Sequence, residues 1–96
     1  MNKKQSPRRV VITGYGAVTP LGMTAQESWQ AIMDDRIGYR FIEKHSAGIK
    51  SRFYGLVDQP LDVTFLPAVI RRRLPRFAHL AMIAAREAME MAFGDK

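Results

Sequence analysis

The sequence of 96 residues contains no cysteine. This absence excludes disulfide scaffolds, thiol nucleophiles and cysteine-ligated metals from the chain itself. Apolar runs are short, and none approaches the ~20 residues that a membrane-spanning helix needs. The basic N-terminal stretch is followed only by the apolar residues 10–12, far fewer than a signal peptide requires. We therefore expect a cytoplasmic protein without a membrane partner.

Acidic residues are also scarce. Nine Asp and Glu stand against fifteen Lys and Arg, which gives a net charge of +6, and the basic residues cluster within residues 3–9 and 71–76. No helix-turn-helix, zinc-finger or aromatic-rich RNA-binding pattern accompanies these clusters, so we expect no nucleic-acid partner. A small basic domain that binds nucleic acid or another acidic partner stays open as an alternative. The hydrophobic share of 47% is typical of a globular protein, and the length allows one small domain at most.

The hydrophobic pattern predicts short elements of both kinds after a flexible basic lead at residues 1–7. The β-branched run at residues 9–13 predicts a buried strand, and residues 52–57 predict a second extended piece. Thr24 and Glu27 have the spacing of a capping box at the start of a helix that ends at Asp34, Asp35 and Gly38. Residues 39–50 are polar and are expected to be irregular.

Two further helices are predicted in the last third of the chain, at residues 66–74 and 75–93. Pro75 suits the first turn of the longer helix, and Gly94 supplies its end. This helix is apolar on two sides, so we expect it to pack inside something larger, with its alanines allowing close approach of neighbouring backbones. One stripe comprises Phe77, Leu80, Ala81, Ala84, Ala88 and Met91, and the other comprises Ala78, Met82, Ala85, Met89 and Phe93.

The glycine-rich loop after the first predicted strand, residues 14–22, invites comparison with a dinucleotide-binding loop. That motif needs a third glycine directly before a helix, whereas here Thr19 stands at that position and Pro20 follows it. Asp34 has the spacing of a ribose-binding acid, but it ends a helix instead of a second strand. We therefore predict a structural loop and no nucleotide cofactor.

Few other side chains have the spacing of a reactive site. His45 lies in a polar segment and is expected to be solvated. His79 shares a helix face with Arg86 and Glu90 and could be hydrogen-bonded there. Neither histidine has a nucleophile or a metal ligand at a recognisable spacing, and Asp34-Asp35 is expected to face water. We predict no catalytic residue and no metal site in this chain.

One string rises above this background. RRVVITGYGAVTPLG, residues 8–22, resembles the N-terminal strand and loop of the β-ketoacyl-acyl-carrier-protein synthases, which have the thiolase fold. The likeness continues in order over residues 8–94 and is closest to the type II elongating synthases. It is carried by Ser28-Trp29, Gly38, the phrase FYGLV at residues 53–57, and Arg72-Arg73-Leu74 leading to Phe77.

The resemblance implies an α/β fold of the thiolase type, in which two similar βαβαβ-type halves surround a buried sheet. Residues 8–96 would form the N-terminal part of the first half: its first core strand, the following helix and a long apolar helix. A buried parallel sheet needs helices on both faces. We therefore expect an N-terminal fragment that is incomplete as a domain.

The implied activity of a full-length synthase is that of an acyltransferase, which condenses malonyl-carrier protein with an acyl-enzyme thioester in fatty-acid or polyketide synthesis. The nucleophilic cysteine and two assisting histidines of the family would lie beyond residue 96, and His45 and His79 match neither histidine motif. The chain alone is thus expected to be inactive. The scheme needs no cofactor, and the full-length protein is expected to be a homodimer. A non-catalytic chain-length-factor subunit stays open as an alternative.

The resemblance also implies an acidic protein partner, the acyl carrier protein. In the family, a basic patch just before the long helix resembles a docking surface for that partner, and it matches Arg72 and Arg73 here, with Arg71 as an addition. Val69 departs from the pattern, because relatives often carry another basic residue there. The alternative is a solvated run of charge between two helices. Arginine suits such docking because its planar fork pairs bidentately with carboxylate or phosphate.

Overall fold

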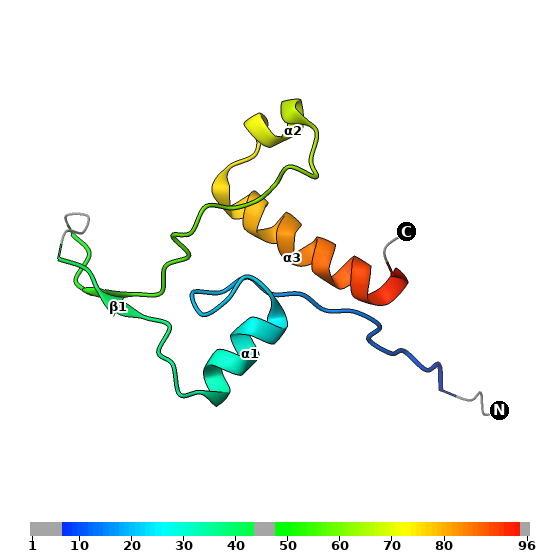
Figure 1. The fold of residues 1–96 in the computed structure, drawn as a ribbon, viewed down its shortest axis with the longest axis horizontal. Coiled ribbons are helices and arrows are strands. Elements are labelled where there is room, and N and C mark those ends of the chain that lie inside the picture. The colour runs from blue at the N-terminus through cyan, green and yellow to red at the C-terminus, as the bar shows by residue number, and fades with distance from the viewer. Residues whose placement is uncertain (1–6, 44–47, 95–96) are drawn as a thin grey trace, which may run out of the picture.

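The computed structural model of the chain describes residues 7–43 and 48–94. Five elements follow one another: α1 (Ala25–Met33), β1 (Arg40–Phe41), β2 (Phe53–Tyr54), α2 (Ala68–Arg73) and α3 (Arg76–Phe93). Helix α3 is the longest of these elements. Helix α1 lies beside it, and the β1–β2 hairpin lies at the left edge of the view in Figure 1. The radius of gyration is 18.7 Å, against about 12–13 Å for a compact domain of this length. The chain therefore adopts an open arrangement.

Helix α1 begins where the capping box predicts. The backbone N–H of Glu27 donates to the Thr24 hydroxyl at 3.0 Å, as expected. The Glu27 carboxylate, however, accepts from the backbone N–H of Met23 at 2.9 Å and not from that of Thr24. The helix ends at Asp34, and Asp35 follows in the left-handed region with φ 60°. The predicted start and end of this helix are both confirmed.

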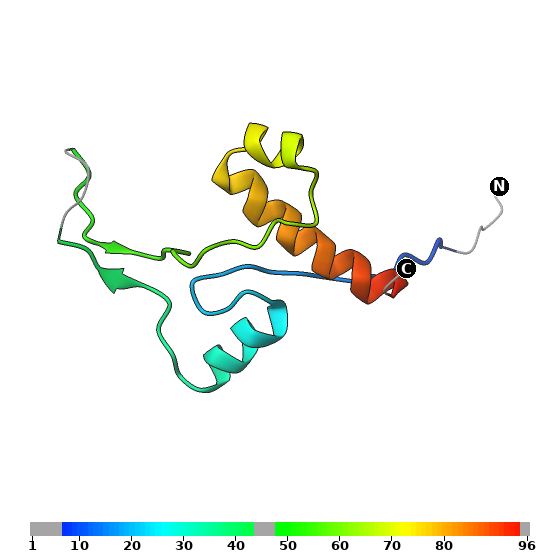
Figure 2. The same cartoon turned by 45° about the horizontal axis from the view of Figure 1, so that its top comes forward.

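The second extended piece is shorter than predicted and has a partner that the sequence did not indicate. Strand β2 covers only Phe53 and Tyr54, and it pairs antiparallel with β1, inside the segment expected to be irregular. The aromatic ring of Phe53 contacts those of Phe41 and Tyr39 edge-on, with centroids 5.7 and 6.0 Å apart. The hairpin therefore depends on cross-strand aromatic contacts, and it extends away from the helices (Figure 2).

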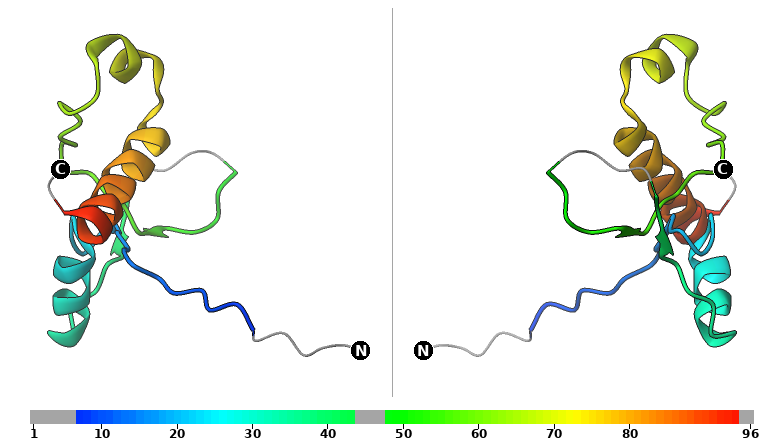
Figure 3. Two further views of the ribbon diagram at one scale, coloured as in Figure 1. Left: turned by 90° about the vertical axis from the view of Figure 1, so that its right-hand side faces the viewer. Right: turned by 90° about the vertical axis from the view of Figure 1, so that its left-hand side faces the viewer.

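The predicted first strand, residues 9–13, does not form in this structure. Its backbone is extended, but it has no strand partner, and Val10, Val11 and Ile12 are 91%, 72% and 85% exposed. Figure 3 shows this segment running out from the helices. A strand exists only through hydrogen bonds to a neighbour, and none of the described residues supplies one. The prediction of a buried core strand is thus corrected for this chain, and the sheet of the described residues is one two-stranded ribbon.

The two C-terminal helices lie close to their predicted bounds. Pro75 is the N-cap of α3, and Gly94 ends the helix with φ 78°. Only one long face of α3 is covered, and it comprises Leu80, Ile83, Ala84, Glu87, Ala88 and Ala92. Met82, Met89 and Phe93, which belong to the second predicted stripe, are exposed. The expectation that α3 packs inside a larger assembly agrees with this uncovered apolar face.

The core is correspondingly small. Among the described residues, only Ser28, Ala31 and Leu66 are buried, whereas twenty large hydrophobic residues are exposed. Exposed apolar surface of this extent is typical of an interaction face. The uncovered stripe of α3 therefore has a direct consequence for the behaviour of the isolated chain in solution.

We expect the isolated chain to self-associate at high micromolar concentrations through the exposed stripe of α3. Replacing Met89 and Phe93 by Glu should weaken association about tenfold or more, because burial of one such side chain contributes roughly 1.5–3 kcal/mol. Sedimentation velocity measures the change. A monomer with a sharp, cooperative thermal transition would contradict this expectation.

Candidate functional site

The glycine loop crosses α3 at van der Waals contact. A Cβ atom added at Gly14 would lie 2.1 Å from the carbonyl oxygen of Ala88, and one added at Gly16 would lie 2.0 Å from that of Ala84. No side chain fits at either distance. The two glycines are therefore needed for close approach, and Ala84 and Ala88 supply the small-residue face on which the loop lies. The close approach expected from the alanines of α3 is confirmed.

Beyond the crossing, the loop closes into a turn that leads into α1. Thr19 and Gly22 exchange two backbone hydrogen bonds, of 2.9 and 3.2 Å. The Thr19 hydroxyl hydrogen-bonds with that of buried Ser28 at 2.7 Å and accepts from the backbone N–H of Leu21 at 3.0 Å. Thr19 thus organises the turn at the position where a dinucleotide-binding loop would carry glycine.

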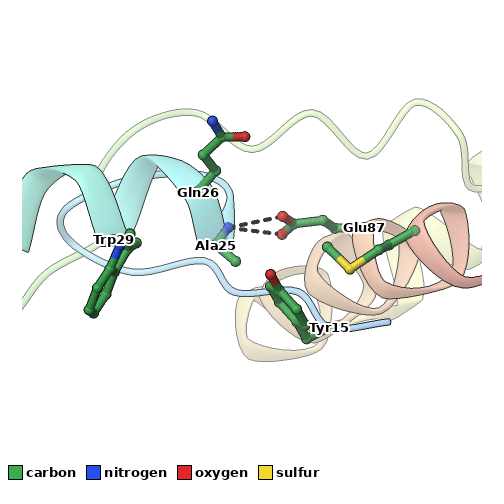
Figure 4. A pocket seen from close by; sticks show the side chains of 6 residues that line it. Tyr15, Ala25, Gln26, Trp29 and Glu87 are labelled. Atoms are coloured by element: carbon green, nitrogen blue, oxygen red, sulfur yellow. Dashed lines mark hydrogen bonds between the residues drawn. The ribbon is translucent and has the colours of Figure 1, made fainter. Parts of the chain in front are cut away.

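Glu87 of α3 links the loop to α1. Its Oε1 accepts from the backbone N–H of Ala17 at 3.0 Å, and both carboxylate oxygens accept from that of Ala25, at 3.1 and 3.0 Å. Ala25 is the first residue of α1, whose N-terminal N–H groups carry a partial positive charge. Figure 4 shows the carboxylate facing this end of the helix. An anion of the chain itself therefore occupies the place that a bound phosphate would take in a dinucleotide-binding loop, which favours the structural interpretation of residues 14–22.

Nothing in the sequence analysis singled out Glu87. It is the acidic residue within the covered small-residue face of α3, between Ala84 and Ala88, and that position is the signal that could have identified it. Next to it lies an open hollow of about 530 Å³, which is lined by Tyr15, Ala25, Gln26, Trp29, Glu87 and Met91 (Figure 4). Two of its lining residues, Tyr15 and Trp29, are exposed. The hollow is thus an apolar recess beside the Glu87 contact.

The predicted docking arginines lie together on α2 but differ in environment. Arg72 and Arg73 are exposed, and the Nε of Arg72 donates to the carbonyl oxygen of Ala68 at 3.3 Å. Arg71 is half-buried, and its Nε is buried with no partner among the described residues. A shallow hollow of about 300 Å³ is lined by Ala68, Arg71 and Arg72. The structure therefore presents Arg72 and Arg73 on the surface and Arg71 only in part.

Arg76, the fourth basic residue of this cluster, donates hydrogen bonds to another segment of the chain. Its Nη2 donates to the carbonyl oxygens of Val57 and Gln59, the latter at 3.0 Å, which ties α3 to the segment after the hairpin. Nearby, Thr64 donates to the Asp62 carboxylate through its hydroxyl and its backbone N–H, and these two bonds lower the pKa of Asp62. These contacts stabilise the connection between β2 and α3.

The remaining candidates of the sequence analysis have structural roles or fall outside the structure. His79 does not bond to Arg86 or Glu90, which pair with each other at 3.1 Å, but contacts the backbone of α2 instead. Asp34 accepts from Gln30 at the end of α1, and Asp34 and Asp35 are both exposed, as expected. His45 lies outside the described residues.

Across residues 7–43 and 48–94, no group of three or more His, Cys, Asp or Glu residues is arranged to hold a metal ion. Among the same residues, no helix has the length and hydropathy needed to cross a membrane.

Comparison with known proteins identifies the family to which the sequence belongs. Residues 7–94 match the family described as "Beta-ketoacyl synthase, N-terminal domain". The 3-oxoacyl-[acyl-carrier-protein] synthase 2 of Synechocystis is 37% identical over 86 residues, which are 88% of this chain and 21% of that protein. Synthase 1 of Escherichia coli is 36% identical over 89 residues, 92% of this chain and 21% of that protein.

A putative polyketide β-ketoacyl synthase 2 of Streptomyces halstedii is 28% identical over 88 residues, 91% of this chain and 21% of that protein. No solved structure matches the chain significantly. The chain thus spans about a fifth of the length of the curated relatives that it matches. Since the family match covers nearly the whole chain, including the glycine loop, α1, α2 and α3, the chain belongs to the family of β-ketoacyl synthase N-terminal domains.

Proposed function

We propose that this chain acts as the N-terminal part of a longer β-ketoacyl-acyl-carrier-protein synthase that elongates acyl chains. The observation that carries the proposal is the family match over residues 7–94, together with relatives whose printed names are 3-oxoacyl-[acyl-carrier-protein] synthases. The uncovered face of α3 and the unpaired residues 9–13 agree with it, because a longer synthase would supply the elements that cover them.

The proposed reaction is a decarboxylative condensation. A cysteine thiolate takes the acyl group from a carrier thioester and releases the carrier thiol. Malonyl-carrier protein then loses carbon dioxide, and the resulting carbanion attacks the acyl-enzyme carbonyl, so that a carbon–carbon bond forms and the cysteine leaves as thiolate. Two histidines stabilise the developing enolate oxygen. The 96 residues contain no cysteine.

Their proposed contribution is a scaffold and a docking surface. In the scaffold, Glu87 holds the glycine loop, α1 and α3 together.

We propose that α2 contributes this docking surface for the acidic acyl carrier protein. Arg72 and Arg73 are exposed on one short helix, and the hollow beside them is lined by two arginines, Arg71 and Arg72. Exposed ion pairs contribute only about 0.2–1 kcal/mol each, so two or three together shift the affinity roughly tenfold. Such contacts act mainly on the association rate and weaken with salt. A surface of this kind recruits a carrier protein without affecting the chemistry.

The docking proposal is tested in a chimeric synthase, in which residues 7–94 of this chain replace the matching segment of the Synechocystis synthase. Changing Arg72 and Arg73 to Glu should raise the KM for carrier-bound substrate about tenfold or more, because attraction becomes repulsion. Condensation of small N-acetylcysteamine thioesters, which lack the carrier protein, should be unchanged. Steady-state kinetics with both kinds of substrate, at low and high salt, measures the difference.

The matched control reverses Arg8 and Arg9, an exposed basic pair outside α2. It should leave both substrates unaffected. Equal loss with carrier-bound and small thioesters, or no loss with either, would remove the α2 arginines from the partner site. A chimeric synthase that folds but forms no carbon–carbon bond would count against the proposed role in condensation.

A further inference from the structure

The stability of helix α2 depends on contacts with the rest of the chain. It has only six residues, whereas isolated helices shorter than about 12–15 residues are marginal in water. Its N-cap is Pro67, which makes no side-chain capping bond, and none of its residues is buried. The orientation of Arg72 and Arg73 therefore depends on contacts from outside α2.

The sequence leaves one carbonyl of α2 without its usual partner. In a continuous helix, the carbonyl oxygen of Arg71 would accept from the backbone N–H four residues later. That residue is Pro75, and proline has no N–H. The preceding carbonyl, that of Ile70, does receive its bond, from the N–H of Leu74 at 3.2 Å. The proline that starts α3 thus leaves the Arg71 carbonyl without a backbone donor.

His79 supplies the missing donor. Its Nε2 lies 3.0 Å from the Arg71 carbonyl oxygen, and because a carbonyl can only accept, the ring carries its proton on Nε2. His79 is half-buried and stands four residues after Pro75, whose own carbonyl accepts from the His79 backbone N–H at 3.2 Å. Pro75 therefore removes the backbone donor for the Arg71 carbonyl at the junction of α2 and α3. The side chain of His79 replaces that donor and connects the two helices.

We propose that His79 is a positioning residue for the carrier-protein docking surface. By donating to the Arg71 carbonyl, it holds the C-terminal turn of α2 against α3 and so orients Arg72 and Arg73, which immediately follow Arg71. The docking role rests on the proposed function, whereas the contact between His79 and α2 does not.

The first test measures amide hydrogen exchange in the 96-residue chain at low micromolar concentration. Exchange at the N–H groups of Arg71 and Leu74, which bond within α2, should accelerate roughly tenfold in His79→Leu, since the turn loses one hydrogen bond. His79→Gln, whose amide can also donate at this distance, should restore slow exchange. Met82→Leu, one turn further along α3, is the matched control and should leave these two amides unchanged.

The second test measures kinetics in the chimeric synthase. His79→Leu should raise the KM for carrier-bound substrate several-fold, with kcat and the KM for N-acetylcysteamine thioesters unchanged, and His79→Gln should reverse this rise. A role limited to general stability would not separate the two substrates.

Three outcomes overturn the proposal or its basis, and they differ from one another. Unchanged exchange in His79→Leu overturns the contact, whether or not the chimeric synthase is active. Faster exchange with an unchanged KM for carrier-bound substrate overturns the positioning role. If reversal of Arg72 and Arg73 leaves that KM unchanged, the docking function itself fails, and the exchange result still decides whether His79 holds α2.

Discussion

The Gly16→Ala variant is expected to separate the glycine loop from α3. The added Cβ would lie 2.0 Å from the carbonyl oxygen of Ala84 and 3.0 Å from the Cβ of Glu87. Because the nearest atom belongs to helix backbone, no side-chain rotation relieves the clash, and we expect a cost of about 3 kcal/mol, at the upper end for overpacking. With so small a core, this region should be unfolded in the variant even without urea.

The measurement is urea unfolding of the chain at low micromolar concentration, followed by the fluorescence of Trp29. Trp29 is the only tryptophan and lies beside the crossing. Gly55→Ala is the matched control, since its Cβ would meet the ring of Pro20 at 3.4 Å and the carbonyl oxygen of Gly38 at 3.7 Å, both ordinary contact distances. If the Gly16 and Gly55 variants have the same unfolding midpoint, the close crossing of the loop over α3 is wrong.

The Glu87→Ala variant is expected to release α1 and the glycine loop together. The N–H groups of Ala17 and Ala25 both donate to this carboxylate, and its charge also faces the positive end of α1. Each hydrogen bond to a charged group contributes about 1.5–3 kcal/mol, so losing the bonds from both N–H groups should cost at least about 3 kcal/mol. Glu87→Gln keeps one acceptor oxygen and should lose about half as much.

Hydrogen exchange at the Ala17 and Ala25 amides reports this contact directly, and Trp29 fluorescence reports the unfolding midpoint. The control is Glu90→Ala, three residues along α3, which removes only an exposed pair with Arg86. Such a pair contributes about 0.3–0.5 kcal/mol. Protection of the two amides that survives Glu87→Ala would show that another group holds the loop.

Local features of the fold could be predicted because they depend on neighbouring residues. The cap at Thr24, the end of α1 at Asp34, and the bounds of α3 between Pro75 and Gly94 all follow from short-range rules, and the structure agrees with them. The partner of β2 could not be predicted, because residues 40–41 carry no strand pattern. They form a strand by pairing with residues 53–54, and the rings of Phe41 and Phe53 are in contact across the pair.

The candidate site likewise has features that the sequence predicts and features that only the structure shows. The basic cluster of α2 and the glycine loop are visible as motifs, and the family match is consistent with the resemblance that the loop carries. Glu87 and His79 acquire their roles only from where α3 lies. Each bonds to backbone groups of another element, which have no side-chain signature in a sequence.

The sequence by itself determined the family, the helix boundaries and the presence of a glycine-rich structural loop at residues 14–22, because each of these depends on residue type and spacing along the chain. Only the tertiary structure decided that residues 9–13 stay unpaired, that the Glu87 carboxylate occupies the N-terminus of α1, and that His79 replaces the N–H that Pro75 lacks. The physical reason is that a hydrogen bond or a strand needs a partner close to it in space, and spacing along the chain does not specify which distant residues come close in the fold.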